Sequence, residues 1–156
     1  MSEAGALEDE SSPAEVAGSL LVFRAGGTTL GIETSFVERL VADDLPRTAV
    51  PGAPAHILGV INHRGAAIAV LDLLTFLALP PADDPTRRLV VVRAAGMGAA
   101  IPVQAIGGIE RVEFDFARLE DAGALDHTRG LLDLESGPVY VLDLPQLLQA
   151  AAARPS

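Results

Sequence analysis

The sequence predicts a mainly β protein built from two small barrels with short helices. The apolar runs are short and rich in Val, Ile and Leu, and Gly or Pro separates them. The two halves also resemble each other, because each ends in a predicted hairpin followed by Leu-Asp-Leu and a short helix. Those tripeptides are Leu71-Asp72-Leu73 and Leu142-Asp143-Leu144. Two similar sets of short, punctuated strands are typical of small barrels.

The first predicted element is a hairpin, in which residues 20–24 and 28–32 flank the turn Ala25-Gly26-Gly27. Residues 36–41 form a third strand-like run or the end of a short helix, and periodicity leaves both open. A loop follows over residues 43–54, which contain three prolines and two aspartates.

The most informative stretch is a second hairpin, whose strands at residues 57–61 and 66–71 flank Asn62-His63-Arg64-Gly65. Gly65 can adopt the positive φ that such turns often need. The hairpin places one fixed cation, Arg64, at the tip of two apolar strands. A helix is predicted over residues 72–79, with Asp72 as its N-cap and Pro80-Pro81 as its end.

The second half repeats this order after a polar linker at residues 80–86. Its predicted strands cover residues 88–93, 99–103 and 106–114, followed by a hairpin of 131–134 with 139–142. Pro145 fits the first turn of a closing helix that runs through Gln149, with Asp143 or Leu144 near its cap.

These elements divide the chain into three parts. Residues 1–18 carry five acidic residues and no cation, and we expect a disordered leader there. Residues 19–150 form the folded domain, with barrels at roughly 19–80 and 86–150, and exchange of strands between them is left open. Residues 151–156 form a C-terminal tail.

Composition excludes several classes of protein. The chain has 156 residues, 49% of them hydrophobic, so it can bury a core and fold alone. It has no Cys, which excludes disulfides and thiolate metal sites and fits a reducing compartment. The net charge of −10 and the scattered arginines argue against nucleic acid as a partner. With no signal peptide and no apolar run of about 18 residues, we expect a cytoplasmic protein.

No catalytic pattern is present, so we expect neither enzymatic activity nor a cofactor. The serines lie outside any nucleophile-elbow pattern, and the glycine-rich stretches lack the Lys of a phosphate-binding loop. The three histidines have no ligand spacing, so no metal is expected. Asp72 and Asp143 resemble a carboxylate pair, but helix capping explains both.

The residues from 19 to 149 resemble the CheW family of chemotaxis coupling proteins. The resemblance rests on Gly31-Ile32, Val37, the Pro-containing loop, Gly59-Val60-Ile61-Asn62-x-Arg64-Gly65 and Val70-Leu71-Asp72-Leu73. It implies two five-stranded, SH3-like barrels. It also implies a non-enzymatic adaptor between methyl-accepting chemoreceptors and a CheA-type histidine kinase, located at the receptor array without insertion in the membrane. The adaptor is expected to be a monomer in isolation and a ring member in cells.

The resemblance also assigns binding residues. The receptor tip is expected to dock near the groove between the barrels, and the kinase regulatory domain to pair barrel to barrel. Expected receptor contacts are Arg64, Asn62, Val37, Leu40, Glu38 and Arg39. Expected kinase contacts are Gly59, His63 and Gly65.

Four residues depart from the family pattern, namely His63 in place of Leu, Ala69 in place of Pro, Arg39 near an acidic position and Gln104 in place of Asp.

Each candidate residue also has a purely structural interpretation. Arg64 can bond bidentately to a receptor carboxylate, or it can cap a carbonyl or pair with a nearby acid. Asn62 and Gly65 fit a role in turn geometry, and Gly59 fits close approach of another backbone, from the fold or from the kinase. Val37 and Leu40 fit the core, although Val37 faces the receptor groove if Phe36 and Leu40 point inward at helical spacing. His63 fits a polar replacement at the surface.

Two other functions remain as alternatives. The chain fits a CheW-like scaffold or localisation factor that recruits a partner to arrays without coupling kinase control. A small-molecule-binding β-barrel is a third hypothesis, which a thermal-shift screen with metabolites tests.

Overall fold

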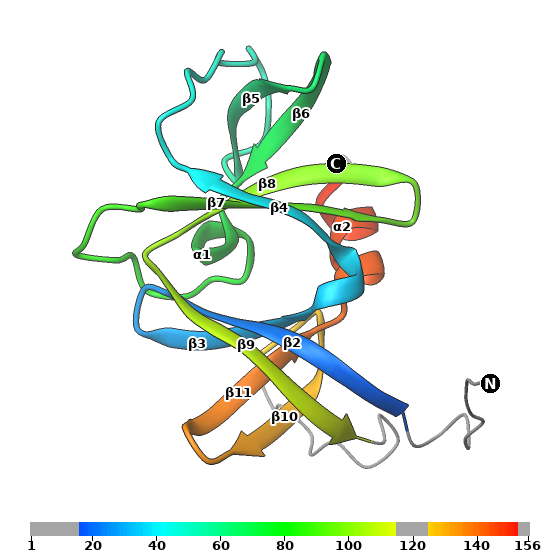
Figure 1. The fold of residues 1–156 in the computed structure, drawn as a ribbon. Helices are drawn as coiled ribbons and strands as arrows, with labels where there is room; N and C mark the ends of the chain where they lie inside the picture. The colour runs from blue at the N-terminus through cyan, green and yellow to red at the C-terminus, as the bar shows by residue number, and fades with distance from the viewer. Residues whose placement is uncertain (1–15, 115–124, 153–156) are drawn as a thin grey trace, which may run out of the picture.

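The computed structural model describes residues 16–114 and 125–152 and contains two five-stranded sheets. We call them the lower sheet, with strand order β10-β11-β3-β2-β9, and the upper sheet, with order β4-β7-β8-β6-β5. Figure 1 shows the two sheets one above the other, with both helices between them. The predicted mainly β fold of two five-stranded units with short helices is confirmed.

The strands of the lower sheet are β2 (Val16–Ala25), β3 (Thr28–Glu33), β9 (Ala105–Phe114), β10 (Thr128–Leu134) and β11 (Gly137–Leu142). Those of the upper sheet are β4 (Val37–Ala42), β5 (Ile57–His63), β6 (Ala66–Leu71), β7 (Arg88–Ala94) and β8 (Met97–Val103). The helices are the 3₁₀ helix η2 (Thr34–Phe36), α1 (Leu73–Phe76) and α2 (Leu144–Ala152).

Several boundaries differ from the expected ones. Strand β2 already begins at Val16, so the last residues of the expected leader belong to the lower sheet, while residues 1–15 lie outside the described part. The ambiguous run at 36–41 is mainly strand β4. Helix α2 includes residues 151 and 152 of the expected tail, and residues 153–156 lie outside the described part.

Helix α1 is shorter than the predicted 72–79 because the chain leaves the helix before the prolines. Ala78 adopts a left-handed conformation with φ of 58°, and the amide of Leu79 bonds to the carbonyl of Leu74 over 2.8 Å. This arrangement is a helix C-terminal motif that usually uses glycine at the left-handed position. The helix N-termini match the prediction. Asp72 accepts from the Thr75 amide at 3.3 Å, and Asp143 accepts from the Gln146 amide at 3.2 Å.

The sheets do not divide the chain at residues 80–86. The lower sheet takes β2 and β3 from the first half and β9–β11 from the second, while the upper sheet takes β4–β6 from the first half and β7–β8 from the second. Two parallel pairs, β3 with β11 and β6 with β8, join the contributions of the two halves. Each sheet therefore depends on both halves of the chain.

This exchange buries β2 and β7 on both faces. Leu20 and Val22 pack in a cluster within the lower sheet, whereas Leu21 and Phe23 pack in a large core between the sheets. Strand β7 alternates likewise, with Leu89 and Val91 inside the upper sheet and Val90 and Val92 in the core between the sheets. We call this common cluster the shared core. Two-sided burial explains why these strands are continuous apolar runs.

Adjacent positions on β7 should therefore be equally sensitive to polar substitution. We expect Val90→Thr and Val91→Thr each to lower the free energy of unfolding by about 1–2 kcal/mol, because each buries an extra hydroxyl. Urea denaturation measures the change, and Val50→Thr at an exposed loop position is the matched control. A strand with one solvated face would instead show a cost at only one of the two sites.

Candidate interaction site at the β5–β6 hairpin

The β5–β6 hairpin turns through two residues, Arg64 and Gly65. Their φ angles are 53° and 81°, and two consecutive positive values define the turn type that matches the twist of paired strands. The Gly65 amide donates to the Asn62 side-chain oxygen over 3.1 Å, which closes the turn. Asn62 and Gly65 thus shape the turn, and their expected contacts with a receptor and a kinase remain predictions.

Arg64 is exposed at this tip and holds a left-handed conformation that is unfavourable for residues other than glycine, asparagine and aspartate. Within residues 16–114 and 125–152, its guanidinium makes neither a hydrogen bond nor an ion pair. The two structural roles considered for Arg64, capping a carbonyl and pairing with an acid, are therefore absent from the described part.

Gly59 is needed by the fold itself. Its φ is 147°, and a Cβ at this position would lie only 2.7 Å from the carbonyl oxygen of Thr48. The Pro-containing loop crosses β5 here, and Thr48 and Val60 exchange two backbone hydrogen bonds of 2.9 Å. Of the two expected reasons for this glycine, close approach within the fold is the one present, and a kinase contact at Gly59 remains a prediction.

Val37 and Leu40 are half-buried and pack against the shared core together with Phe36. The helical spacing that would turn Val37 away from Phe36 and Leu40 does not apply, because Val37 is the first residue of strand β4 and pairs with Val92. Both residues lie at the rim of the core, and contact with a receptor remains a prediction for each.

Glu38 and Arg39 lie at a bulge in β4. The register passes from Val37 opposite Val92 to Arg39 opposite Val91, so Glu38 is the extra residue. Its carboxylate accepts from Arg93 Nε over 2.9 Å, while Arg39 is exposed. Nothing in the sequence pointed to Arg93, because only the pairing of β4 with β7 brings it beside Glu38.

His63 is half-buried at the end of β5, directly opposite Ala66. His56 and His127 both contact the ring of Phe76, with ring centroids 4.8 Å apart in each pair. No cluster of three potential metal ligands occurs among the described residues. Likewise, no helix in the described ranges is long and apolar enough to cross a membrane.

Glu33, at the end of β3, is a partly buried carboxylate beside Arg129. Its Oε1 lies 3.5 Å from Arg129 Nε, too far for a strong hydrogen bond, and makes no other hydrogen bond there. Burial raises the pKa of Glu33, and nearby Asp143 raises it further, while Arg129 opposes both. The sequence gives no signal for this pair, because Glu33 and Arg129 come from opposite halves.

Two hollows are lined in part by residues of the β5–β6 hairpin. One, of about 440 Å³, is lined by exposed Leu58 and by residues of α1 and of the 79–86 segment. The other, of about 240 Å³, is apolar and lies between β6, β8 and the end of α2, with Ala69, Met97 and Leu148 in its walls. Gln104 borders the first hollow. Its Oε1 accepts from the Gly26 amide at 2.7 Å, and its Nε2 donates to the Asp84 carbonyl at 3.3 Å.

The close approach at Gly59 predicts a large effect of a single methyl group. We expect Gly59→Ala to lower the free energy of unfolding by about 2–3 kcal/mol, because it adds a backbone clash to an unfavourable φ. Gly52→Ala is the control, since Gly52 also has positive φ but open space around it, and should cost about 1 kcal/mol. Thermal and urea denaturation measure both, and equal costs would contradict the clash.

The raised pKa of Glu33 predicts a stabilising substitution. A carboxyl whose pKa is higher in the folded state makes the fold less stable as pH rises from the ordinary glutamate value of 4.5 through the pKa of the folded state. Glu33→Gln should therefore be more stable than the wild type at pH 7, and the difference should shrink toward pH 4. Urea denaturation across this range measures it, and a destabilised variant at pH 7 would show that the Arg129 pair outweighs burial.

The sequence is similar to known proteins of one family. The CheW-like domain model matches residues 19–152. Protein FrzA of Myxococcus xanthus is 30% identical over 138 residues, which are 85% of this chain and 86% of FrzA. The probable chemotaxis protein CheW of Rhizobium etli is 38% identical over 73 residues, which are 47% of this chain and 46% of that protein. The latter match thus spans about half of each protein.

A solved structure shares the fold. The crystal structure of the scaffolding protein TtCheW from Thermoanaerobacter tengcongensis matches with a TM-score of 0.73 and 22% identity, covering 85% of this chain and 88% of that one. The resemblance inferred from the hairpin motif is confirmed. The chain belongs to the CheW family, the non-enzymatic adaptor and scaffold proteins of chemotaxis signalling.

Proposed function

We propose that this protein couples transmembrane chemoreceptors to a CheA-type histidine kinase at a cytoplasmic receptor array. It binds the cytoplasmic tip of a methyl-accepting chemoreceptor and the regulatory domain of the kinase at the same time. It performs no chemistry of its own, so its effect on the kinase comes from binding alone.

The observation that carries this proposal is that Arg64 is exposed and has no hydrogen bond or ion pair within the described residues. The fold does not need an arginine at this turn, because the β7–β8 hairpin turns in the same way through Ala95 and Gly96, whose φ angles are 54° and 76°. The left-handed conformation therefore belongs to this type of turn, and what Arg64 adds to it is an exposed positive charge. An exposed guanidinium without a partner in the described residues can bind a carboxylate bidentately.

Coupling follows from linked equilibria. If the receptor has two conformations that bind the adaptor with different affinity, the bound kinase shifts with them by the same free-energy difference. Each contact can be weak, because closing a ring of adaptors and kinase domains raises the effective concentration of every further contact. The rigid connection of both sheets through the shared core supports such transmission.

The alternative is a scaffold that recruits a partner to arrays without control of the kinase, a role in keeping with the description of TtCheW as a scaffolding protein. Deletion of the gene separates the two. Loss of a coupling protein abolishes receptor control of kinase activity, whereas loss of a scaffold leaves that control intact but misplaces the partner.

Substitution of Arg64 should separate binding from stability. We expect Arg64→Asn to raise the free energy of unfolding by up to about 1 kcal/mol, because asparagine tolerates positive φ, yet to weaken partner binding. Arg64→Glu should weaken binding at least tenfold, about 1.4 kcal/mol, while stability stays within about 1 kcal/mol of the wild type. Calorimetric titration with purified kinase regulatory domain and receptor tip measures binding, and urea denaturation measures stability.

Arg88→Glu is the matched control, since Arg88 is an exposed arginine on β7 away from the tip. Its binding should equal that of the wild type. If the wild-type protein binds neither partner, the proposed function is wrong. If Arg64→Glu instead loses several kcal/mol of stability, Arg64 is a structural residue.

A further inference from the structure

The two halves of the chain have the same fold, element by element. We call residues 16–79 half 1, and residues 86–114 and 125–152 half 2. Strands β2–β6 and helix α1 of half 1 correspond in order to β7–β11 and α2 of half 2, and this correspondence converts the strand order of one sheet into that of the other. Even a bulge is repeated, because Gly59 on β5 and Gly130 on β10 each follow a register shift and have φ angles of 147° and 146°.

Each half lacks the strands that would complete its own sheets. Its first two strands lie in one sheet, whereas its third strand and its last hairpin lie in the other. Four strand pairs join half 1 to half 2, namely the parallel pairs β3–β11 and β6–β8 and the antiparallel pairs β2–β9 and β4–β7. The halves are therefore interlocked in the way that two chains are when they exchange identical elements.

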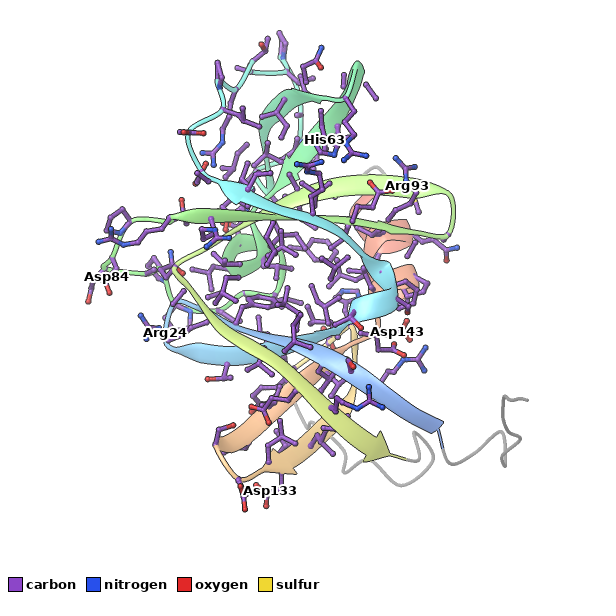
Figure 2. The ribbon with its side chains drawn as sticks, in the orientation of Figure 1. Arg24, His63, Asp84, Arg93, Asp133 and Asp143 are labelled. Atoms are coloured by element: carbon purple, nitrogen blue, oxygen red, sulfur yellow. The ribbon has the colours of Figure 1, made fainter. Side chains whose placement is uncertain are left out.

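The linker between the halves, residues 80–85, is loosely attached. Three of its six residues are prolines, which favour an extended course, and it borders the hollow of about 440 Å³. The Asp84 carbonyl accepts from Gln104 over 3.3 Å, and the Asp84 carboxylate lies 3.8 Å from exposed Arg24, a contact that contributes little. Figure 2 shows Asp84 and Arg24 at the outer edge of the molecule. Moving the linker therefore breaks few contacts.

We propose that two copies of this chain exchange halves, so that half 1 of each copy pairs with half 2 of the other. The product is a dimer of two complete domains, in which the sheets, the helices and the shared core keep the contacts of the monomer and only the linker takes a new course. Fully extended, six residues span about 20 Å, which lets the linker pass from one domain to its neighbour. The exchange depends on the fold alone and not on the proposed function.

Exchange competes with closure of each chain on itself. A short flexible linker holds the segments that it joins at an effective concentration of the order of mM. Refolding from urea at about 10 µM chain should therefore give almost only monomer, whereas refolding at about 1 mM should give comparable amounts of monomer and dimer. Size-exclusion chromatography with light scattering measures the two forms. Monomer alone after refolding at the higher concentration would overturn the proposal.

An engineered disulfide distinguishes exchange from ordinary association of two monomers. The chain has no cysteine, so every thiol is an introduced one. Ser19 of half 1 lies opposite Arg111 of half 2, and Cα atoms of opposite residues in antiparallel strands are about 4.5–5.5 Å apart, within disulfide range. In the Ser19→Cys, Arg111→Cys double variant, the bond joins a monomer to itself but joins two chains in the exchanged dimer. Denaturing electrophoresis without reductant should show a covalent dimer from the dimer fraction only.

The Asp133→Cys, Pro138→Cys double variant is the matched control. These exposed residues lie opposite each other on β10 and β11, both in half 2, so their disulfide stays within one chain in either form. The dimer fraction of this control should run as a monomer on the same gel. If the dimer fraction of the Ser19→Cys, Arg111→Cys variant also ran as an oxidised monomer, the dimer would be an ordinary association and the proposal would be wrong.

A second measurement needs no substitution. Because the halves are interlocked, exchange requires unfolding, and a dimer once formed should persist after dilution to the lower concentration. Dimers of unlabelled and isotope-labelled chains, mixed without urea, should therefore form no mixed dimer in native mass spectrometry, whereas refolding the mixture together should produce them. Rapid mixing without urea would contradict the exchange of halves.

Discussion

Burial of β2 and β7 on both faces is the constraint on which the rest of the structure depends. One face of each strand packs in the cluster of its own sheet, and the other face packs in the shared core. Neither sheet can form from one half of the chain, because each combines two strands of one half with three of the other. The helices α1 and α2 fill the same core through Leu73 and Leu144, each directly after a capping aspartate.

The edge strands of the two sheets share one irregular feature. Each of the four edge strands, β4, β5, β9 and β10, carries a bulge, which prevents uncontrolled pairing with other chains. The bulged residues are Glu38, Leu58, Gly107 and Arg129. Three of them have particular surroundings: Glu38 meets Arg93, Leu58 lines a hollow, and Arg129 meets Glu33. The devices that protect the edges thus also set the surface chemistry of this adaptor.

Local signals were enough to predict much of the fold and the tip of the site. Asn62 and Gly65 predicted the turn, because Asn62 supplies a side-chain hydrogen-bond acceptor and Gly65 tolerates the positive φ that the turn requires. Asp72 and Asp143 were predicted as caps because aspartate bonds to backbone amides in the first helical turn. The hairpin motif also identified the family.

The features that the sequence did not predict are those that depend on strand register and sheet topology. The exchange of strands leaves no local trace, since a turn between β3 and β4 looks the same whichever sheet the next strand enters. The pairs Glu38–Arg93 and Glu33–Arg129 join distant strands, and each requires a bulge that shifts register by one residue. Likewise, only the pairing of Arg39 with Val91 shows that Arg39 shares a face of the upper sheet with Val91.

Exchange of strands should make both sheets one cooperative unit that holds the β5–β6 turn and the shared core in a fixed relation. Native-state amide hydrogen exchange measures this most directly, through the opening free energies of β2 and β7 at their centres. The structure predicts that amides of Leu21 and Val22 exchange with the same free energy as those of Val90 and Val91, equal to that of global unfolding. Exchange of one set at a markedly lower free energy, with the other still protected, would mean that one sheet opens alone and would contradict the account.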